Sequence, residues 1–322
     1  MAGAADLLAD DLRSGGAGQV TLVDDASVCC HFRGSMHTLR IGVLGSVGII
    51  LDDATIAVPD LSPVLASLRH GMLSELGLGP RPRFRVELTD GTKRQIVITA
   101  LHDRLGWAND PADWQLNLAR RHGLWVAEVG QLHYSRRFGR LRRQPWSTNP
   151  VVASVLVRMA KIRPNQTVHD PCCGTGTLLI AAGLVAPSLR ISGTDHDHET
   201  LERARSNLFD QRLPARLAEA DAIPIPHPPG TVDRIICNLP FGKQVGSHSD
   251  NLILYQRLMH EIARTLRADG RAVLLTEDKR LLVEATAATP GVKIIRDRLL
   301  RYNGATPTAY VITRTRTDRR RR

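Results

Sequence analysis

The stretch DPCCGTGT, residues 170–177, joins an apolar segment that ends at His169-Asp170 to an apolar helical segment that begins at Thr177. Glycines in such a turn let the backbone approach a ligand closely and point the N-terminus of the following helix at it. The stretch lacks the third glycine of the GxGxxG dinucleotide pattern and the GK[ST] ending of a P-loop. It therefore predicts a strand, a ligand-binding loop and a helix, with a ligand other than a pyrophosphate.

The sequence on either side of this stretch alternates between apolar strands and helices. Strands that are apolar on both faces and alternate with helices are typical of a parallel sheet covered by helices on both sides. The sequence thus predicts an α/β domain with a doubly wound sheet. We expect helices at 151–162, 177–186, 198–208 and 252–266, and strands ending at 170 and spanning 189–194, 215–218, 232–237, 271–276, 293–300 and 309–313.

The sequence before residue 145 has a different rhythm, with shorter elements and more proline and glycine. Alternating residues predict strands at Phe84–Thr89 and Gln95–Ile98, with Asp90-Gly91 as a hairpin turn between them, and Val64–Leu76 has the spacing of a helix. This pattern indicates a small α+β accessory domain. We predict that domain at 1–130, a basic linker at 131–146, the α/β domain at 147–317 and an arginine-rich tail at 318–322.

The charge of the chain favours a polyanionic partner. The sequence has 43 Lys and Arg against 32 Asp and Glu, a net charge of +11, and +7 remains without the four terminal arginines. Such a surplus favours nucleic acid before a membrane surface. The residues expected to contact nucleic acid are those of the basic linker, which surround Phe138, together with one lysine: Arg136, Arg137, Arg140, Arg142, Arg143 and Lys243.

Other classes of protein are disfavoured by the sequence. Two vicinal cysteine pairs and a single cysteine fit neither a disulfide framework nor a zinc site. The longest apolar run, Ile41–Leu51, has 11 residues, well short of the ~20 that span a bilayer. The acidic N-terminus lacks the layout of a signal peptide. We therefore expect a soluble, cytoplasmic protein with reduced thiols, no metal and no membrane.

Acidic residues follow three successive predicted strands. Asp170 enters the glycine loop, Asp195 closes the next strand and Asp221 follows the third. In an open α/β sheet these positions line one crevice. Acceptors there suit a ligand with a sulfonium, an ammonium, ribose hydroxyls and an adenine amine, as in S-adenosylmethionine. The alternative is that each aspartate only caps a helix or turn.

The second informative stretch is NLPFGK, residues 238–243, which follows the fourth predicted strand. The side-chain carbonyl of Asn238 and the backbone carbonyl of Leu239 can accept both hydrogens of an amine conjugated to a ring, which frees its lone pair for methylation. Pro240 stiffens the turn and donates no N–H. Phe241 can stack on a planar base, a contact of ~1–3 kcal/mol. The alternative is a β-turn with a core phenylalanine.

Together, DPCCGTGTLLIAAG and the NLPFGK that follows about sixty residues later resemble the THUMP-associated RNA guanine-N2 methyltransferases. Tyr134–Arg137 and Asn303–Pro307 resemble the entry and closing segments of that family. The resemblance implies a class I Rossmann-like methyltransferase fold whose last strand runs antiparallel. It also implies S-adenosylmethionine as cofactor and the exocyclic amine of a guanosine, most often in tRNA, as acceptor. The accessory domain is then expected to be a divergent THUMP-like RNA-binding domain.

The resemblance also implies roles for individual residues. The glycine loop would hold the methionine and ribose portions of the cofactor, Asp195 the ribose hydroxyls and Asp221 the adenine amine. The guanine would be held by the catalytic group Asn238, Leu239, Pro240 and Phe241. The cofactor-binding residues expected on this basis are Asp170, Cys172, Gly174, Thr175, Gly176, Thr177, Asp195, Asp221, Ala222 and Asn238.

Three other functions remain open from the sequence. Methyltransferases of adenine, cytosine or protein glutamine carry related NPPY or DPPY motifs, and Leu239 and Phe241 favour the RNA-guanine branch over them. A methyltransferase of ribosomal RNA would carry the same motifs. A non-catalytic RNA-binding scaffold would have no need of the acceptors Asp170, Asp195 and Asn238, which are all present.

Overall fold

The computed structural model describes residues 2–32, 45–75, 77–129, 138, 140–186, 188–240 and 248–315. The chain divides into two compact units. We call the first the α/β unit, which comprises Met1–Ala9, Thr21–Cys29 and Phe138–Arg322. The second, the accessory unit, comprises Asp10–Val20 and Cys30–Arg137. The division between residues 137 and 138 lies within the predicted basic linker, and two N-terminal segments group with the α/β unit.

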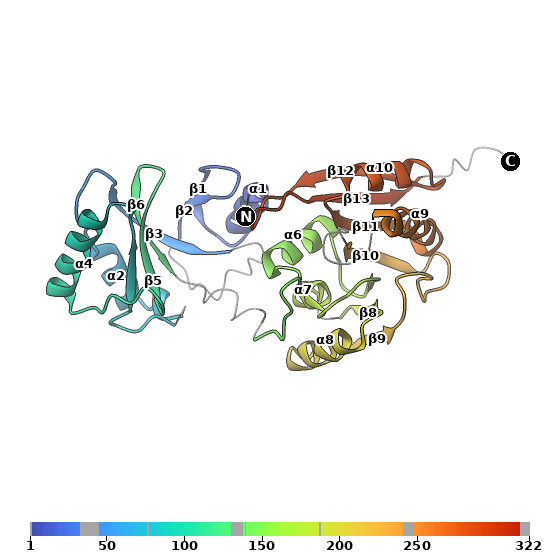
Figure 1. Ribbon diagram of the computed structural model, residues 1–322, viewed down its shortest axis with the longest axis horizontal. Helices are drawn as coiled ribbons and strands as arrows, with labels where there is room; N and C mark the ends of the chain where they lie inside the picture. Colours follow the sequence, from blue (N-terminus) through green and yellow to red (C-terminus); the bar gives the residue numbers. More distant parts are fainter. Residues whose placement is uncertain are drawn as a thin grey trace. The chain divides into compact units, whose positions relative to one another are not determined.

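The described part of the α/β unit is built on a seven-stranded sheet (Figure 1) with the strand order β12-β13-β11-β10-β7-β8-β9. The pairs from β11 through β9 are parallel, whereas β13 runs antiparallel to both β11 and β12. This arrangement confirms the predicted mostly parallel sheet with an antiparallel last strand. The strands are β7 Thr167–Asp170, β8 Arg190–Asp195, β9 Ala215–Glu219, β10 Val232–Asn238, β11 Leu266–Thr276, β12 Val292–Leu299 and β13 Thr308–Arg314.

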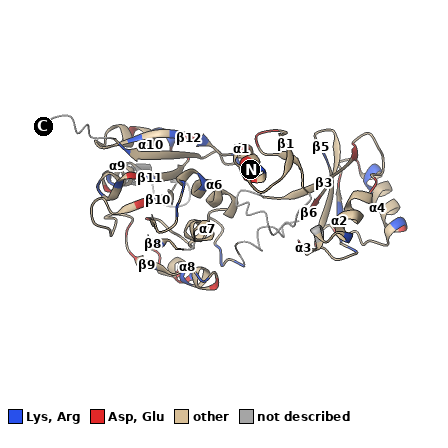
Figure 2. Ribbon diagram, turned by 180° about the vertical axis from the view of Figure 1, so that it is seen from behind, with Lys and Arg blue, Asp and Glu red and all other residues tan. Residues whose placement is uncertain are grey.

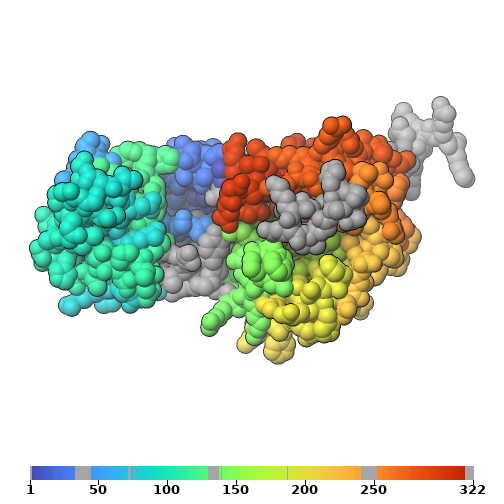
Figure 3. All heavy atoms as spheres, in the orientation of Figure 1, coloured from blue at the N-terminus to red at the C-terminus, as the bar shows by residue number. Residues whose placement is uncertain are grey.

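Helices between the strands cover this sheet, and α6 packs against α7 while α9 packs against α10. Figure 3 shows one face of the unit, with the β7–β9 half in green and yellow and the β10–β13 half in orange and red. Among the described residues no helix is long and apolar enough to cross a membrane. The helices are α6 Pro150–Ala160, α7 Thr177–Val185, α8 His198–Asp210, α9 His248–Thr265 and α10 Lys279–Ala287.

Local sequence explains where the helix before the glycine loop begins and ends. The side chain of Asn149 accepts a hydrogen bond from the N–H of Val151 at 2.8 Å, and Pro150 occupies the first turn, where it leaves no donor unpaired. Lys161 ends α6 in the left-handed conformation, with φ 51°. All residues of α6 except Arg158 are buried, so the helix is a core element beside the loop.

The accessory unit contains, in its described part, a four-stranded sheet with the order β3-β6-β5-β4, in which only β4 and β5 are parallel. With its helices it is the expected α+β fold. Its elements are β3 Val47–Asp53, α2 Ser62–Arg69, α3 Met72–Glu75, β4 Phe84–Glu87, α4 Gly91–Leu105, β5 Leu116–Arg121 and β6 Leu124–Val129; α1 Ala5–Ser14, β1 Gly18–Leu22 and β2 Val28–His31 precede them.

Two predictions for this region are wrong. Residues 95–98 lie in helix α4, because Asp90 accepts a hydrogen bond from the N–H of Lys93 at 3.0 Å and acts as a helix cap instead of a hairpin turn. Val97 and Leu101, four residues apart, form the buried face of α4. The single helix predicted at 64–76 is divided into α2 and α3, because Gly71 adopts a φ of 81° between them.

Candidate active site

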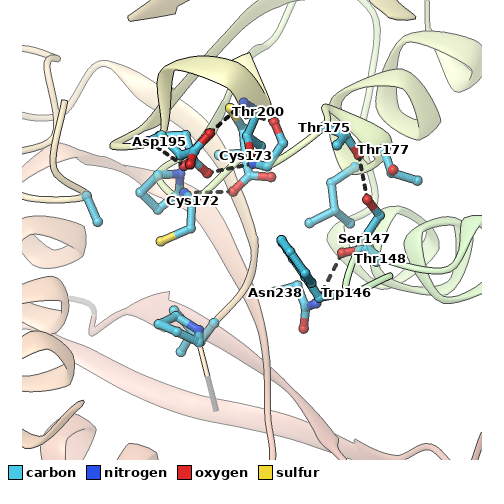
Figure 4. A pocket seen from close by; sticks show the side chains of 18 of the residues that line it. Trp146, Ser147, Thr148, Cys172, Cys173, Thr175, Thr177, Asp195, Thr200 and Asn238 are labelled. Atoms are coloured by element: carbon cyan, nitrogen blue, oxygen red, sulfur yellow. Dashed lines mark hydrogen bonds between the residues drawn. The ribbon is translucent and has the colours of Figure 1, made fainter. Parts of the chain in front are cut away.

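A cavity of about 910 Å³ opens in the α/β unit where strands β7, β8 and β10 end. Asp170 and Asp195 are the last residues of β7 and β8, Asn238 is the last residue of β10, and all three line the cavity (Figure 4). Asp221, two residues beyond β9, lines it as well. Ligands of open parallel sheets bind at this edge. The three predicted acidic strand ends therefore meet around one cavity.

The glycine loop adopts a conformation that few other residues allow. Gly174 and Gly176 have φ values of 51° and 81°, both in the left-handed region. A side chain at Gly176 would also lie 3.4 Å from the Cβ of Ala204 on α8, whereas no described atom lies within 4 Å of a Cβ built at Gly174. The backbone angle, not lack of space, therefore favours glycine at position 176, and Gly174 leaves open space beside the loop.

Asp170 has the most perturbed carboxyl of the cavity. Its side chain is fully buried, and its pKa is raised to about 8, mainly by burial and also by the charge of Asp195, while the N–H of Cys172 lowers it. That N–H donates to Oδ1 at 3.1 Å, while Oδ2 has no hydrogen-bond partner among the described residues. Near neutral pH the group is mostly protonated, and a cation placed beside it would favour the ionised form.

Asp195 is held in place by backbone donors. The N–H of Gly174 donates to its Oδ2 at 2.8 Å, and the N–H of Asp197 donates to its Oδ1 at 3.1 Å. Asp197 in turn accepts from the N–H of Thr200 and caps α8. The carboxylate of Asp195 therefore has a fixed orientation between the loop and α8.

The side-chain amide of Asn238 is oriented by one neighbour. Its Nδ2 donates to Oγ1 of Thr148 at 3.1 Å (Figure 4). Its Oδ1 is buried and finds no donor within the described ranges. A buried acceptor without a donor is unfavourable by about 1–3 kcal/mol. The oxygen is thus available to a ligand that brings its own N–H.

The turn after Asn238 is also held from outside. The N–H of Leu239 donates to the carbonyl of Leu275 at 3.0 Å. The hydroxyl of Tyr255 on α9 donates to the carbonyl of Pro240 at 3.1 Å and lies 2.8 Å from Oγ1 of Thr276. Strand β11 and helix α9 therefore fix the backbone of Leu239 and Pro240.

The other predicted site residues lie in different places. Cys172, Thr175, Thr177, Ala222, Leu239, Pro240 and Arg143 line the cavity, and Gly176 caps α7 without lining it. Arg142 pairs with Asp210 at 2.6 Å, and Arg140 is exposed. Phe241, Lys243, Arg136 and Arg137 lie outside the described residues.

Three residues of the site were not predicted from the sequence. Thr148 contacts Asn238 across 90 positions of chain, and no local pattern links the two. Asn207, 1% exposed on α8, joins the backbone of Arg142 to the carbonyl of Thr175. Tyr255 lies on the apolar face of a predicted amphipathic helix, where an aromatic residue indicates only core packing.

Apart from Asp170, the buried titratable groups near the cavity are held in their neutral forms. Burial raises the pKa of the thiols of Cys173 and Cys237, so both stay protonated. His169 is fully buried against Ser192, and burial lowers its pKa to about 3. In the described ranges no group of three or more His, Cys, Asp or Glu could hold a metal ion. The site therefore offers a ligand hydrogen-bond acceptors, such as Asp195 and Asn238, while the two thiols and His169 stay neutral.

Comparisons with known proteins agree with this fold and site. The sequence model of the family described as UPF0020, RMKL-like, methyltransferase domain, matches residues 137–302. A tRNA (guanine(6)-N2)-methyltransferase of Thermus thermophilus is 32% identical over 180 residues, which are 55% of this chain and 53% of that protein. A U6 snRNA (guanine-N(2))-methyltransferase THUMPD2 of Bos taurus is 32% identical over 143 residues, 44% of this chain and 28% of that one.

Solved structures extend the similarity beyond the matched sequence. TrmN from Thermus thermophilus has a TM-score of 0.74 and 26% identity, with 97% of both chains covered. SMU.472 complexed with SAH has a TM-score of 0.71 at 15% identity, which shows the same fold. In sequence, the chain matches about half the length of the Thermus relative and less of the THUMPD2 relative.

Proposed function

The chain belongs to the family of RMKL-like methyltransferase domains, and on that premise we propose that it transfers a methyl group from S-adenosylmethionine to the exocyclic N2 amine of a guanosine in tRNA. The observation that carries this proposal is the buried Oδ1 of Asn238, which lacks a donor among the described residues. The names of the relatives, which act on guanine N2 of tRNA or U6 snRNA, support the choice of base.

The residues of the cavity fit the proposed cofactor. Asp170 offers a buried carboxyl oxygen without a described partner to a cationic group. Asp195 offers a fixed carboxylate for ribose hydroxyls, and Asp221 and Ala222 line the cavity and would contact the adenine. The open backbone at Gly174 leaves room for the methionine portion. When bound, the cofactor supplies an electrophilic methyl group on a sulfonium.

The chain's own contribution to the reaction is to orient the amine. The lone pair of the N2 amine of guanine is delocalised into the ring, so it is a poor nucleophile. If Oδ1 of Asn238 and the carbonyl of Leu239 each accept one N–H, the nitrogen becomes pyramidal and its lone pair can attack the methyl carbon. With the cofactor bound, the methyl group would pass from the sulfonium sulfur to this nitrogen, which would then lose one proton to solvent. No strong base is required.

The remaining assignments concern RNA binding. We assign Phe241, which lies outside the described residues, to stacking on the guanine. We assign Arg140, Arg142 and Arg143, with Arg136, Arg137 and Lys243 outside the described ranges, to phosphate contacts. The accessory unit would bind the RNA as a divergent THUMP-like domain. Similarity to TrmN over 97% of both chains supports a common architecture that includes this unit.

The decisive experiment is to incubate the protein with methyl-labelled cofactor and fractionated RNA, then digest the RNA and identify the labelled nucleoside. We expect N2-methylguanosine from the tRNA fraction. Label in adenosine, in cytidine or in added protein would contradict the base assignment. Label confined to ribosomal RNA would contradict the assignment to tRNA.

A substitution tests the role of the amide. Asn238→Ala removes one of the two acceptors, an interaction needed mainly in the transition state, so we expect kcat to fall ~10²–10³-fold. Cofactor affinity, measured by calorimetry, should fall much less than kcat. Asn238→Asp should retain more activity, because a carboxylate accepts the same hydrogens. Wild-type single-turnover rates in Asn238→Ala would disprove the orienting role.

A further inference from the structure

The wall of the cavity carries one tryptophan in an unusual setting. Of the four tryptophans, Trp107 and Trp125 are 2% and 0% exposed, and the guanidinium of Arg85 lies 4.0 Å from the ring of Trp114. Trp146 is 57% exposed and lines the cavity. A large aromatic ring gains most of its stabilisation from burial. An indole left uncovered on a concave wall therefore indicates a surface that a ligand covers.

The indole of Trp146 lies close in the chain to Thr148, the residue that orients Asn238. Trp146 lies two residues before Thr148, whose hydroxyl holds the amide of Asn238 at 3.1 Å. Two trans peptide bonds keep the Cα atoms of Trp146 and Thr148 within ~7.6 Å. Figure 4 shows Trp146 and Asn238 in the same cavity. A planar base whose amine is bound at Asn238 is thus within reach of the indole.

The turn that carries Trp146 is fixed on both sides. Ser147 accepts a hydrogen bond from the N–H of Gln144 at 2.8 Å, and its hydroxyl lies 3.1 Å from that of Thr175 in the glycine loop. Its carbonyl accepts from Nη2 of Arg143 at 3.1 Å. The indole therefore projects from a rigid segment, which lowers the entropic cost of binding a ligand against it.

Two arginines in the wall of the cavity favour one class of ligand for the indole. Arg143 and Arg257 line the same cavity, and Arg257 is exposed. S-adenosylmethionine carries no phosphate, whereas a nucleotide of an RNA chain has a planar base flanked by phosphates. An exposed aromatic ring in a cavity that also carries two arginines is a combination that binds unstacked bases of single-stranded RNA.

We propose that Trp146 is a substrate-binding residue whose indole stacks on the guanine held at Asn238, with Arg143 and Arg257 contacting the flanking phosphates. This inference rests on the proposed function, because it requires an RNA base at Asn238.

The test compares Trp146→Ala and Trp146→Phe with the wild type on tRNA at saturating cofactor. Loss of stacking on one base should raise KM for RNA about tenfold to a hundredfold in Trp146→Ala, with little change in kcat and a cofactor affinity within twofold. Trp146→Phe should be intermediate. Adding RNA should quench indole emission in the wild type more than in Trp146→Phe.

Phe209→Ala is the matched control, since Phe209 is an aromatic residue that is 82% exposed and does not line the cavity. It should have the KM of the wild type. An unchanged KM in Trp146→Ala, or a loss of cofactor affinity as large as the loss for RNA, would overturn the inference while leaving the proposed function intact. If the wild type forms no N2-methylguanosine, the proposed function and this inference are both wrong.

Discussion

Asp170 illustrates how a single residue can link burial to ligand binding. Its carboxyl is removed from water at the end of β7, and that burial raises its pKa to about 8, from an ordinary 3.8. Ionising it without a counter-charge is unfavourable, because the buried anion is neither solvated nor neutralised. A cationic cofactor would supply that counter-charge. The cost of burying Asp170 in the free protein therefore increases the preference of the site for a cation.

Proton release on cofactor binding follows from this pKa. At pH 7 Asp170 is mostly protonated in the free protein, whereas a bound sulfonium or ammonium favours its ionised form. Cofactor binding should therefore release up to one proton. Cofactor affinity should accordingly increase as the pH rises toward 8. Calorimetry in buffers of different ionisation enthalpy measures that proton. Asp170→Asn should release none. Equal release from both proteins would show that another group titrates.

The same pKa determines the sign of a stability effect. The folded value lies above the unfolded one, so the contribution of Asp170 to stability is complete below about pH 4 and is lost as the pH rises toward about 8. The free wild-type protein should therefore lose more stability between pH 5 and 8.5 than Asp170→Asn, as thermal melting would report. Saturating cofactor should reduce that difference.

At the scale of elements, the site depends on α8 as much as on the strands. Asn207 donates to the carbonyls of Arg142 and Thr175 at 3.1 and 2.9 Å and accepts from the N–H of Arg142 at 2.8 Å. One buried amide thus holds together the segment before α6, the glycine loop and α8. The geometry of the glycine loop therefore depends on α8 and on the segment before α6, because the hydrogen bonds of Asn207 join the loop to both.

Asn207→Leu tests this arrangement. It removes three hydrogen bonds and leaves the buried carbonyl of Thr175 and the part-buried backbone of Arg142 without this partner, so we expect a loss of about 2–4 kcal/mol in the free energy of unfolding together with weaker cofactor binding. Arg142→Ala is the control, because it removes only the exposed pair with Asp210 and keeps the Arg142 backbone. That pair should contribute at most ~1 kcal/mol. Equal losses in both variants would contradict the role of Asn207.

Elements of the α/β unit were predictable because their signals are local. A continuous apolar run such as Val232–Cys237 predicts a buried strand, and a GxG turn predicts a tight loop between a strand and a helix. Helix α4 was mispredicted because Ile96, Val97 and Ile98 resemble a strand, while its cap at Asp90 also fits a turn. The contacts of Asn238 with Thr148 and of Pro240 with Tyr255 were beyond prediction, since they depend on how distant segments meet.

At the scale of the whole molecule, the basic surplus is concentrated in one unit. The α/β unit has 29 Lys and Arg against 20 Asp and Glu, a net charge of +9, whereas the accessory unit has 14 against 12, or +2. Figure 2 shows Lys and Arg on β12 and on α8, α9 and α10. Electrostatic attraction of RNA should therefore come mainly from the α/β unit.

Two N-terminal segments are part of the α/β unit, which makes simple truncation a poor way to isolate it. Arg298 on β12, whose side chain is 12% exposed, donates to both carboxylate oxygens of Asp6 at 2.6 Å, and this pairing lowers the pKa of Asp6. Arg301 pairs with Asp25 at 2.7 Å. Leu8 is 9% exposed in the same unit. Residues 1–29 thus supply partners for two arginines and part of the core.

Two deletions should therefore behave differently. Removing residues 1–137 strips Arg298 and Arg301 of their carboxylates and uncovers apolar surface, which should cost on the order of 3 kcal/mol and lower the Tm by about 6–12 °C. Replacing only residues 30–137 with a flexible Gly-Ser linker keeps those contacts, so the Tm and the cofactor affinity of the α/β unit should be retained. Differential scanning calorimetry and cofactor titration of both proteins provide the comparison.

Asp6→Asn in the full chain is the control for the ion pair alone, and it should lower the Tm by much less than the longer deletion. If both deletions melted at the same temperature, residues 1–29 would contribute nothing to the α/β unit, and the accessory unit could be removed as one continuous N-terminal block.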